Sequence, residues 1–208
     1  MDDSADEQPG RRPGYRRSAG SERGDARRRE LLDAVTDDVA AHGLVDFSLR
    51  RAARAAGTTH KVLLYHFDSA EDLLAQAVTG LRARRIERGL AAAGGPEDGT
   101  LADRVLALWP VLVTEEAAVL DQAIGLAMYD PQRHADLGRG ASRQYLPSLL
   151  SLCPAAWSDR RRLEVAEMVL ATLRGFLVDT RTSGDTAGIA AGFEALRRAL
   201  DREEAAGG

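Results

Sequence analysis

Hydrophobic positions along this chain recur at helical spacing, and no segment shows the alternation typical of a strand. The first apolar stripe, within residues 25–43, consists of Leu31, Leu32, Val35 and Val39. His42 and Gly43 follow it, and these residue types suit a helix end, because a cation offsets the negative carbonyl end and glycine tolerates the turn. The pattern predicts an all-α protein whose first helix runs from Asp25 to this end.

Two short helices and one long helix are predicted next, because each apolar segment is preceded by a hydroxyl residue. Ser48 and Thr59 can each accept a hydrogen bond from a free backbone N–H at a helix start, and Gly57 separates the two short segments. Ser69, with an acid three positions later, predicts a capped start for the long helix, which extends toward Ala93. The motif GGPEDG then closes this helix.

The second half of the chain also reads as helices, which prolines interrupt. Proline removes an amide donor and crowds the preceding turn, so these helices should be kinked or broken at Pro110, Pro131, Pro147 and Pro154. The last two segments, residues 158–184 and 185–204, should form an antiparallel hairpin about the turn SGD. Their stripes contain Leu163, Ala166, Leu170, Leu173, Phe176 and Leu177, then Ile189, Phe193, Leu196 and Leu200.

Composition divides the chain into a tail and two domains. Residues 1–24 hold Gly, Pro, Ser, Arg and acids with almost nothing apolar to bury, which predicts a disordered basic and polar tail. This tail is either a solvated segment or a basic arm that adds attraction to phosphates. Residues 25–93 would form a three-helix domain with its connecting helix, and residues 94–208 a larger helical domain.

Charge is unevenly distributed, although the formal net charge of the whole chain is -4. Residues 11–29 hold eight arginines against two acids, and residues 48–67 hold four cations and no acid. The single cysteine, Cys153, permits no intramolecular disulfide and no CxxC metal pair. No apolar signal core or membrane-length segment is present, so we expect a soluble, cytoplasmic protein without a membrane partner.

Two short helices joined by a tight turn and preceded by a supporting helix match a helix-turn-helix, whose second short helix enters the DNA major groove. Such a reader needs long donors for guanine and phosphate, short hydroxyls near the backbone, and aromatic edges. The candidates for contact with double-stranded DNA are Ser48, Arg50, Thr59, His60, Lys61, Tyr65 and His66. Arg51 and Arg54 should instead be solvated or salt-bridged, and the spacing of the two histidines does not suit a metal.

The run from Arg27 to Leu74 resembles the N-terminal DNA-binding domain of the tetracycline-repressor (TetR) family of transcriptional regulators. The likeness lies in RRELLDAV and AHGLVDFSLRRAARAAGTTHKVLLYHFDSAEDLL, where the apolar residues, the HG turn, the hydroxyl before LRRAARAAG and the aromatic HF fall in register. The family's common tyrosine falls at Leu64, with Tyr65 one position later, and Ala70 stands where a lysine often follows the serine. Phosphate contacts by those two side chains are therefore not carried over.

The resemblance implies that residues 94–208 bind a small-molecule effector and form a homodimer, with no cofactor. Candidate effector contacts among the middle helices are Leu108, Trp109, Leu112, Leu126, Met128, Tyr129 and Tyr145. The stripes of the terminal hairpin would pair with those of a second copy in a four-helix bundle, or they would only close the chain's own core. A two-fold dimer predicts a palindromic operator, and the family implies a repressor.

Two other functions stay open at this level. A nucleoid-type protein would bind DNA by charge alone, weakly and without sequence preference. A helical enzyme would turn over its small-molecule ligand. The sequence argues against the enzyme, because GRGAS at residues 138–142 lacks the strand–turn–helix context of a nucleotide site and no Walker motif is present.

Overall fold

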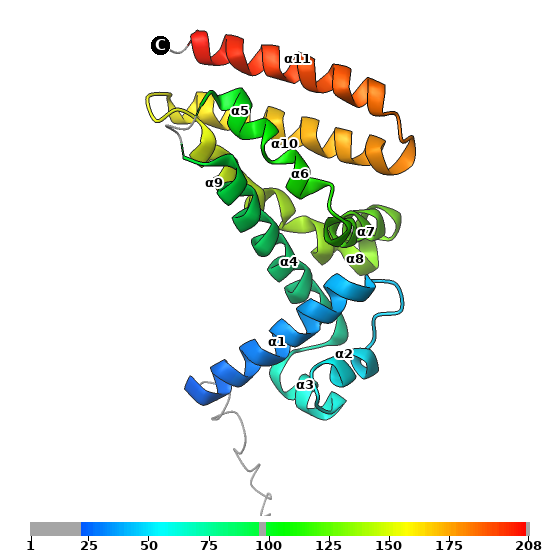
Figure 1. Ribbon diagram of the computed structural model, residues 1–208. Helices are drawn as coiled ribbons and strands as arrows, with labels where there is room; N and C mark the ends of the chain where they lie inside the picture. The colour runs from blue at the N-terminus through cyan, green and yellow to red at the C-terminus, as the bar shows by residue number, and fades with distance from the viewer. Residues whose placement is uncertain (1–21, 96–98, 207–208) are drawn as a thin grey trace, which may run out of the picture.

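The computed structural model describes residues 22–95 and 99–206, which form eleven helices and no strand (Figure 1). This confirms the predicted all-α class. Of the tail expected over residues 1–24, residues 1–21 lie outside the described part of the chain, and the last three belong to the first helix. The helices are α1 Glu22–His42, α2 Leu49–Ala55, α3 His60–His66, α4 Ala70–Ala93, α5 Leu101–Leu106, α6 Trp109–Leu112, α7 Glu115–Tyr129, α8 Pro131–Arg139, α9 Ala141–Leu152, α10 Asp159–Thr182 and α11 Thr186–Ala205.

The three predicted hydroxyl caps are present and start α2, α3 and α4. The Oγ atoms of Ser48 and Thr59 each accept from the backbone N–H three positions later, at 3.3 and 3.4 Å. Ser69 Oγ accepts from the Asp72 N–H at 3.0 Å, while the Asp72 carboxylate accepts from the Asp68 N–H. These bonds satisfy amides that a first helical turn leaves without a partner, so local sequence determines where each helix begins.

The turn after α1 is held by a side chain from the second half of the chain. Gly43 has φ +74°, a backbone conformation that side chains other than glycine rarely adopt. A β-carbon at Gly43 would lie 2.9 Å from Gln122 Oε1 of α7. The same oxygen accepts a hydrogen bond from the Leu44 N–H at 3.1 Å. The connection between α1 and α2 therefore rests directly on α7.

A first hydrophobic core joins α1–α4 to α7 and α8. Leu63 of α3 and Phe67, which follows α3, are buried in it with residues of α1 and α4. Its members from beyond residue 94 are Val119, Leu120, Ala123 and Leu137. The division into residues 25–93 and 94–208 stays a prediction, because apolar packing continues across it.

A second core lies between the far end of α4 and helices α5, α9, α10 and α11. Figure 1 shows α10 and α11 running antiparallel at the end of the molecule opposite α1–α3, with α4 extending between the two ends. Asp185 caps α11 by accepting from the Gly188 N–H at 2.9 Å, so the predicted hairpin is confirmed. None of the described helices is long and apolar enough to cross a lipid bilayer.

Of the four prolines predicted to interrupt helices, two lie at helix starts and one follows a helix end, and Pro147 is the exception. Pro110 lies in the first turn of α6, Pro131 begins α8, and Pro154 follows the end of α9. Pro147 lies inside α9, so a break predicted there is wrong. Its ring is exposed, which leaves the other side of α9 free to pack on the second core, and that packing offsets the lost backbone hydrogen bond.

Candidate functional site

The outward face of α3 is the first candidate surface. Leu63 points into the core, while four side chains of α3 are exposed: His60, Lys61, Leu64 and Tyr65. Thr59, which caps the helix, is exposed as well. A short turn around Gly57, whose φ is +57°, separates this helix from α2. The local sequence therefore presents one side of α3 to solvent and buries the other.

Two neighbouring arginines of α2 have different surroundings. Arg51 points inward, and its Nε donates to Asp38 Oδ2 at 2.6 Å. Its two terminal nitrogens donate to the backbone oxygens of Val45, Asp38 and Gly43. This confirms the prediction that Arg51 is salt-bridged. Arg50 is exposed on the outer side of α2, and Ser48 is exposed at its start.

His66 is the only predicted DNA-contact residue that is partly buried. Its backbone oxygen accepts from Arg28 Nε at 3.2 Å, and its ring meets the Tyr65 ring edge-on with centroids 5.0 Å apart. Desolvation lowers the pKa of His66 below its ordinary value, and the positive charges of Arg28 and Arg27 lower this pKa further. The lowered pKa favours the neutral imidazole in the free protein.

Leu64 belongs to the exposed face of α3 although it was not among the predicted contacts. Its side chain is 47% exposed, which is unusual for a leucine within a seven-residue helix that packs on a core. The sequence carried the signal, since Leu64 lies four positions after His60 and three after Lys61, on the same helix side. An apolar group here suits contact with a thymine methyl.

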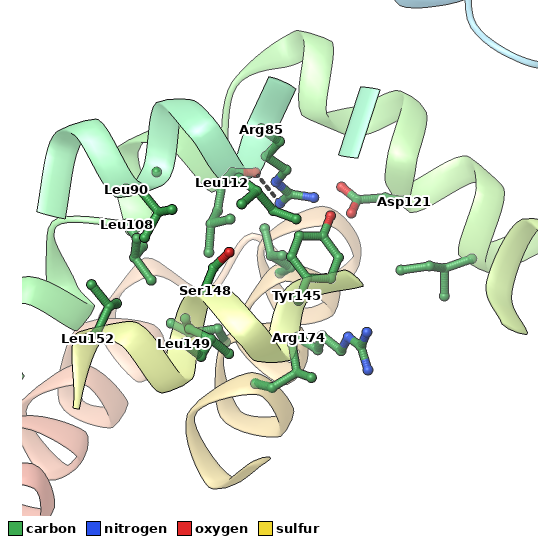
Figure 2. Close-up of a pocket in the computed structure, with 16 residues that line it drawn as sticks. Arg85, Leu90, Leu108, Leu112, Asp121, Tyr145, Ser148, Leu149, Leu152 and Arg174 are labelled. Atoms are coloured by element: carbon green, nitrogen blue, oxygen red, sulfur yellow. Dashed lines mark hydrogen bonds between the residues drawn. The ribbon is translucent and has the colours of Figure 1, made fainter. Parts of the chain in front are cut away.

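The second candidate site is a cavity lined by residues of α4, α6, α7, α9 and α10, many of which belong to the second core (Figure 2). A water-sized sphere can occupy about 80 Å³ of it, and the empty space is about 690 Å³ when the gaps between lining atoms and the open mouth are counted. At Gly89 the wall is closely packed, because a β-carbon there would lie 3.3 Å from Leu108 Cδ2. Most of its lining is apolar, including Ile86, Leu90, Leu108, Leu112, Leu149, Leu152 and Leu173.

Only three of the seven predicted effector contacts line this cavity: Leu108, Leu112 and Tyr145. The other four lie elsewhere. Trp109 packs edge-on against the rings of Phe176 and Phe193, and Leu126 packs against the first core. Met128 and Tyr129 are 78% and 91% exposed at the end of α7, because this last turn extends past the helices that cover α7.

Apart from Tyr145, the polar side chains of the cavity belong to residues that the sequence did not single out. Arg85 Nη2 donates to the Leu112 backbone oxygen at 3.0 Å, and Arg174 Nη1 donates to Ser142 Oγ at 3.1 Å. Asp121 accepts from Arg181 Nε at 3.2 Å. Within the described residues, no group of three or more His, Cys, Asp or Glu side chains is placed to hold a metal ion.

The stripes predicted to pair with a second copy lie largely inside this chain. Of the ten residues, Ala166, Leu170, Leu173, Leu177, Ile189, Leu196 and Leu200 are buried, and Phe176 and Phe193 pack against the second core. Only Leu163 is exposed. Side chains buried in this way are not available to another copy, so a homodimer interface stays a prediction that would have to use the outward side of the hairpin. There α10 exposes Met168, Ala171, Gly175 and Val178, which we name the outer α10 stripe.

Comparison with known proteins found similar structures. No family model and no curated protein sequence matches the chain. The proposed transcriptional regulator SCO7518 from Streptomyces coelicolor A3(2) is 23% identical, with a TM-score of 0.62, over 84% of this chain and 98% of that one. A proposed TetR-family regulator from Mesorhizobium loti MAFF303099 is 17% identical, with a TM-score of 0.63, over 89% and 98% of the chains.

The multidrug binding protein EbrR, solved with imidazole, is 20% identical to this chain and has a TM-score of 0.63. The match covers 84% of this chain and 90% of that protein. At such identities the likeness establishes the fold, including the helix-turn-helix and the helical domain that follows it. The chain therefore has the all-α fold of TetR-family transcriptional regulators.

Proposed function

We propose that this protein is a ligand-responsive, DNA-binding transcriptional regulator that reads double-stranded DNA with α3. The observation that carries the proposal is the outward face of α3, where His60, Lys61, Leu64 and Tyr65 are exposed together on a helix-turn-helix. This face offers a cation, aromatic edges and an apolar group, which are the chemistries that contact phosphates, base edges and thymine methyls. Residues 25–93 would form the DNA-binding domain with its connecting helix.

Arg50, Ser48 and Thr59 would flank the reading helix and contact the DNA backbone. Both hydroxyls cap helices, so the amide-rich starts of α2 and α3 lie beside them. The pKa of His66 is lowered in the free protein, and a nearby phosphate would raise it and favour the protonated form. These contacts would position the protein on the duplex, and the α3 face would supply sequence preference.

A second copy of the chain would pack on the outer α10 stripe. Ala171 and Gly175 lie at its centre and allow close approach, while Met168 and Val178 supply apolar contact area. The facing side of α11 exposes further small residues, Ala187, Ala191 and Ala195. A two-fold dimer of this kind would place two α3 helices on a palindromic operator with half-sites roughly 34–36 Å or somewhat more apart.

A ligand in the cavity would act on the DNA-reading helices through α4 and α7. Both helices contribute to the first core and also line the cavity. On α7, Asp121 lines the cavity, while its neighbour Gln122 accepts a hydrogen bond from the Leu44 N–H. A ligand that binds one arrangement of these helices more tightly than another would favour that arrangement. In the dimer this would change the distance between the two α3 helices and release DNA. Repression would follow when the operator overlaps a promoter.

The test is selection of random double-stranded DNA by the purified full chain at about 150 mM salt, which weakens purely electrostatic binding. Recovery of a palindromic sequence is the expected result, and Lys61→Ala or Tyr65→Ala should weaken or change that selection. The exposed Arg143 of α9 provides a control, since Arg143→Ala should select the same sequence. Salt-sensitive recovery of unselected DNA would instead favour a nucleoid-type protein, and turnover of a bound ligand would favour an enzyme.

Dimerisation is tested by Ala171→Glu, which would bring two like charges together near the two-fold axis. Sedimentation should show a dimer for the unaltered chain and a monomer for the variant. Ala92→Glu on α4 is the matched control, because Ala92 is an exposed alanine outside the outer α10 stripe. A dimer that survives Ala171→Glu would rule out this surface.

A further inference from the structure

Two arginine side chains, Arg85 and Arg174, line one side of the cavity, and a third, Arg82, is close enough to interact electrostatically with both. Arg82 and Arg85 lie one turn apart on α4 and are both buried, and Arg174 reaches the same region from α10. Each donates to a neutral oxygen: Arg82 to the Leu137 carbonyl, Arg85 to the Leu112 carbonyl and Arg174 to the Ser142 hydroxyl. Among the described residues, none of the three forms an ion pair with a carboxylate. The cluster therefore holds positive charge that the chain itself does not neutralise.

These guanidinium groups are close enough to affect one another. Burial is the main cause that lowers the pKa of Arg82, and the positive charges of Arg174 and Arg85 lower this pKa further, while Tyr145 acts in the opposite direction. Buried cations that repel one another are normally compensated by a nearby carboxylate. The missing acid indicates that a negative group from outside the chain can complete the cluster.

Among the described residues that line the cavity, Asp121 is the only acidic one, and it already has a partner. Its Oδ2 accepts from Arg181 Nε at 3.2 Å, and Arg181 also donates to the Thr114 backbone oxygen at 3.1 Å. This pair lies at the more exposed edge of the cavity. Asp121 therefore leaves the charge of Arg85 largely unopposed and does not offer a free site for a cationic ligand.

Arg85 has an unused hydrogen-bond donor. Its residue is only 5% exposed, and its Nε is buried without a hydrogen-bond partner. Such a buried N–H is costly to leave unpaired. Figure 2 shows the guanidinium of Arg85 and the hydroxyl of Tyr145 pointing toward one another in the cavity. A ligand oxygen between them could accept from both groups.

The opposite side of the cavity is apolar. Leu90, Leu108 and Leu152 lie together at one end, as Figure 2 shows, while Arg85, Tyr145 and Arg174 lie at the other. Ser148 is between the two groups. A molecule that satisfies both ends needs an apolar body, which loses little on leaving water, and one anionic head, which replaces its hydration with charged donors.

We propose that the cavity binds an amphipathic organic monoanion, with a carboxylate or similar acid head held by Arg85 and its apolar body among Leu90, Leu108 and Leu152. Arg174 and Arg82 would add favourable charge around the head. This inference rests on the proposed function, in which the same cavity is the effector site. It goes further by naming the chemical class of the effector and by excluding cations of the same size.

The chemical class of the ligand is tested with two series of probes, in each of which the apolar part stays the same and the head group changes. The first series is octanoate, octanamide and octylamine, and the second is 2-naphthoate, 2-naphthamide and 2-naphthylmethylamine. Their binding to the full chain is measured by titration calorimetry at pH 7.5. In at least one series the carboxylate should bind about 10- to 100-fold more tightly than its amide, as expected for one charge-assisted hydrogen bond in place of a neutral one. The amines should bind most weakly.

The role of Arg85 in holding the anionic head is tested by Arg85→Met, which keeps the length and apolar area of the side chain. The carboxylate-to-amide ratio of affinities should fall to near one, and Arg85→Lys should restore part of the preference. Ligand-free Arg85→Met should melt no lower than the unaltered chain, because an uncompensated buried charge has been removed. Arg143→Met, an exposed arginine on α9, should keep the full preference.

Equal or tighter binding of the amides or amines, a preference that survives Arg85→Met, or failure of both carboxylates to bind would overturn the proposal. These outcomes are separable from failure of the proposed function. Selection of DNA by the same protein reports on α3 and does not require a cavity ligand. A protein that selects a palindrome but prefers amines would remain a regulator whose effector class differs from the one proposed.

Discussion

Replacing Arg51 with methionine should destabilise the protein without removing a DNA contact. The Arg51 guanidinium connects α2 to the end of α1 through four hydrogen bonds. One goes to the Asp38 carboxylate at 2.6 Å, and the others go to the backbone oxygens of Val45, Asp38 and Gly43 at 3.2, 3.1 and 2.9 Å. Methionine fills similar volume but donates none of these bonds, so α2 would lose its main polar attachment to α1.

The expected cost follows from burial and bond count. The side chains of Arg51 and Asp38 are 14% and 13% exposed, so water can replace the lost bonds only in part. Breaking a fully buried ion pair costs about 3–5 kcal/mol, and the partial exposure here reduces the estimate to about 2–3 kcal/mol. For a protein of this size that corresponds to a melting temperature lower by roughly 5–10 °C.

Urea unfolding followed by circular dichroism measures this cost, and Arg50→Met and Arg54→Met are the matched controls on the same helix. Both controls concern exposed side chains and should stay within about 0.5 kcal/mol of the unaltered chain. Arg50→Met should instead weaken binding to the selected operator. If Arg51→Met were as stable as the controls while abolishing DNA binding, the assignment of Arg51 to structure and Arg50 to DNA would be refuted.

Gly192→Ala should cost about 1–3 kcal/mol in urea unfolding, because its β-carbon would lie 2.6 Å from Phe176 Cε1; unchanged stability would contradict the packing. The pKa of His66 is lower in the folded chain than its ordinary value of 6.5, so below pH 6.5 the unfolded chain binds a proton there more readily. The free energy of unfolding should therefore fall as the pH is lowered from 6.5. DNA affinity should rise over the same range if a nearby phosphate favours the protonated ring, and titrations of His66→Gln should lack that rise. Gln122→Ala should accelerate hydrogen exchange of the Leu44 amide by removing its 3.1 Å partner; an unchanged rate would exclude this link.

Features that depend on a few neighbouring residues were predictable from the sequence. Ser48, Thr59 and Ser69 start helices as expected, because a hydroxyl reaches only the amides of the next turn. The same holds for the terminal hairpin and for the exposed side of α3, which follow from helical periodicity.

Which helix face meets which neighbour was decided only by the tertiary structure. Arg50 and Arg51 are adjacent and identical in type, yet only Arg51 reaches Asp38. Met128 and Tyr129 look like cavity residues by type but are exposed.

Two further features depend on the tertiary structure in the same way. The hairpin stripes suited either a second copy or the chain's own core, and Leu200 and its neighbours are buried within the second core of this chain. Arg85 was not singled out from the sequence, although it lines a cavity to which α6, α7 and α9 also contribute. Helical periodicity predicts which side of a helix is apolar and which side is charged. The partner of that side comes from segments tens of residues away, whose position depends on the packing of the whole chain.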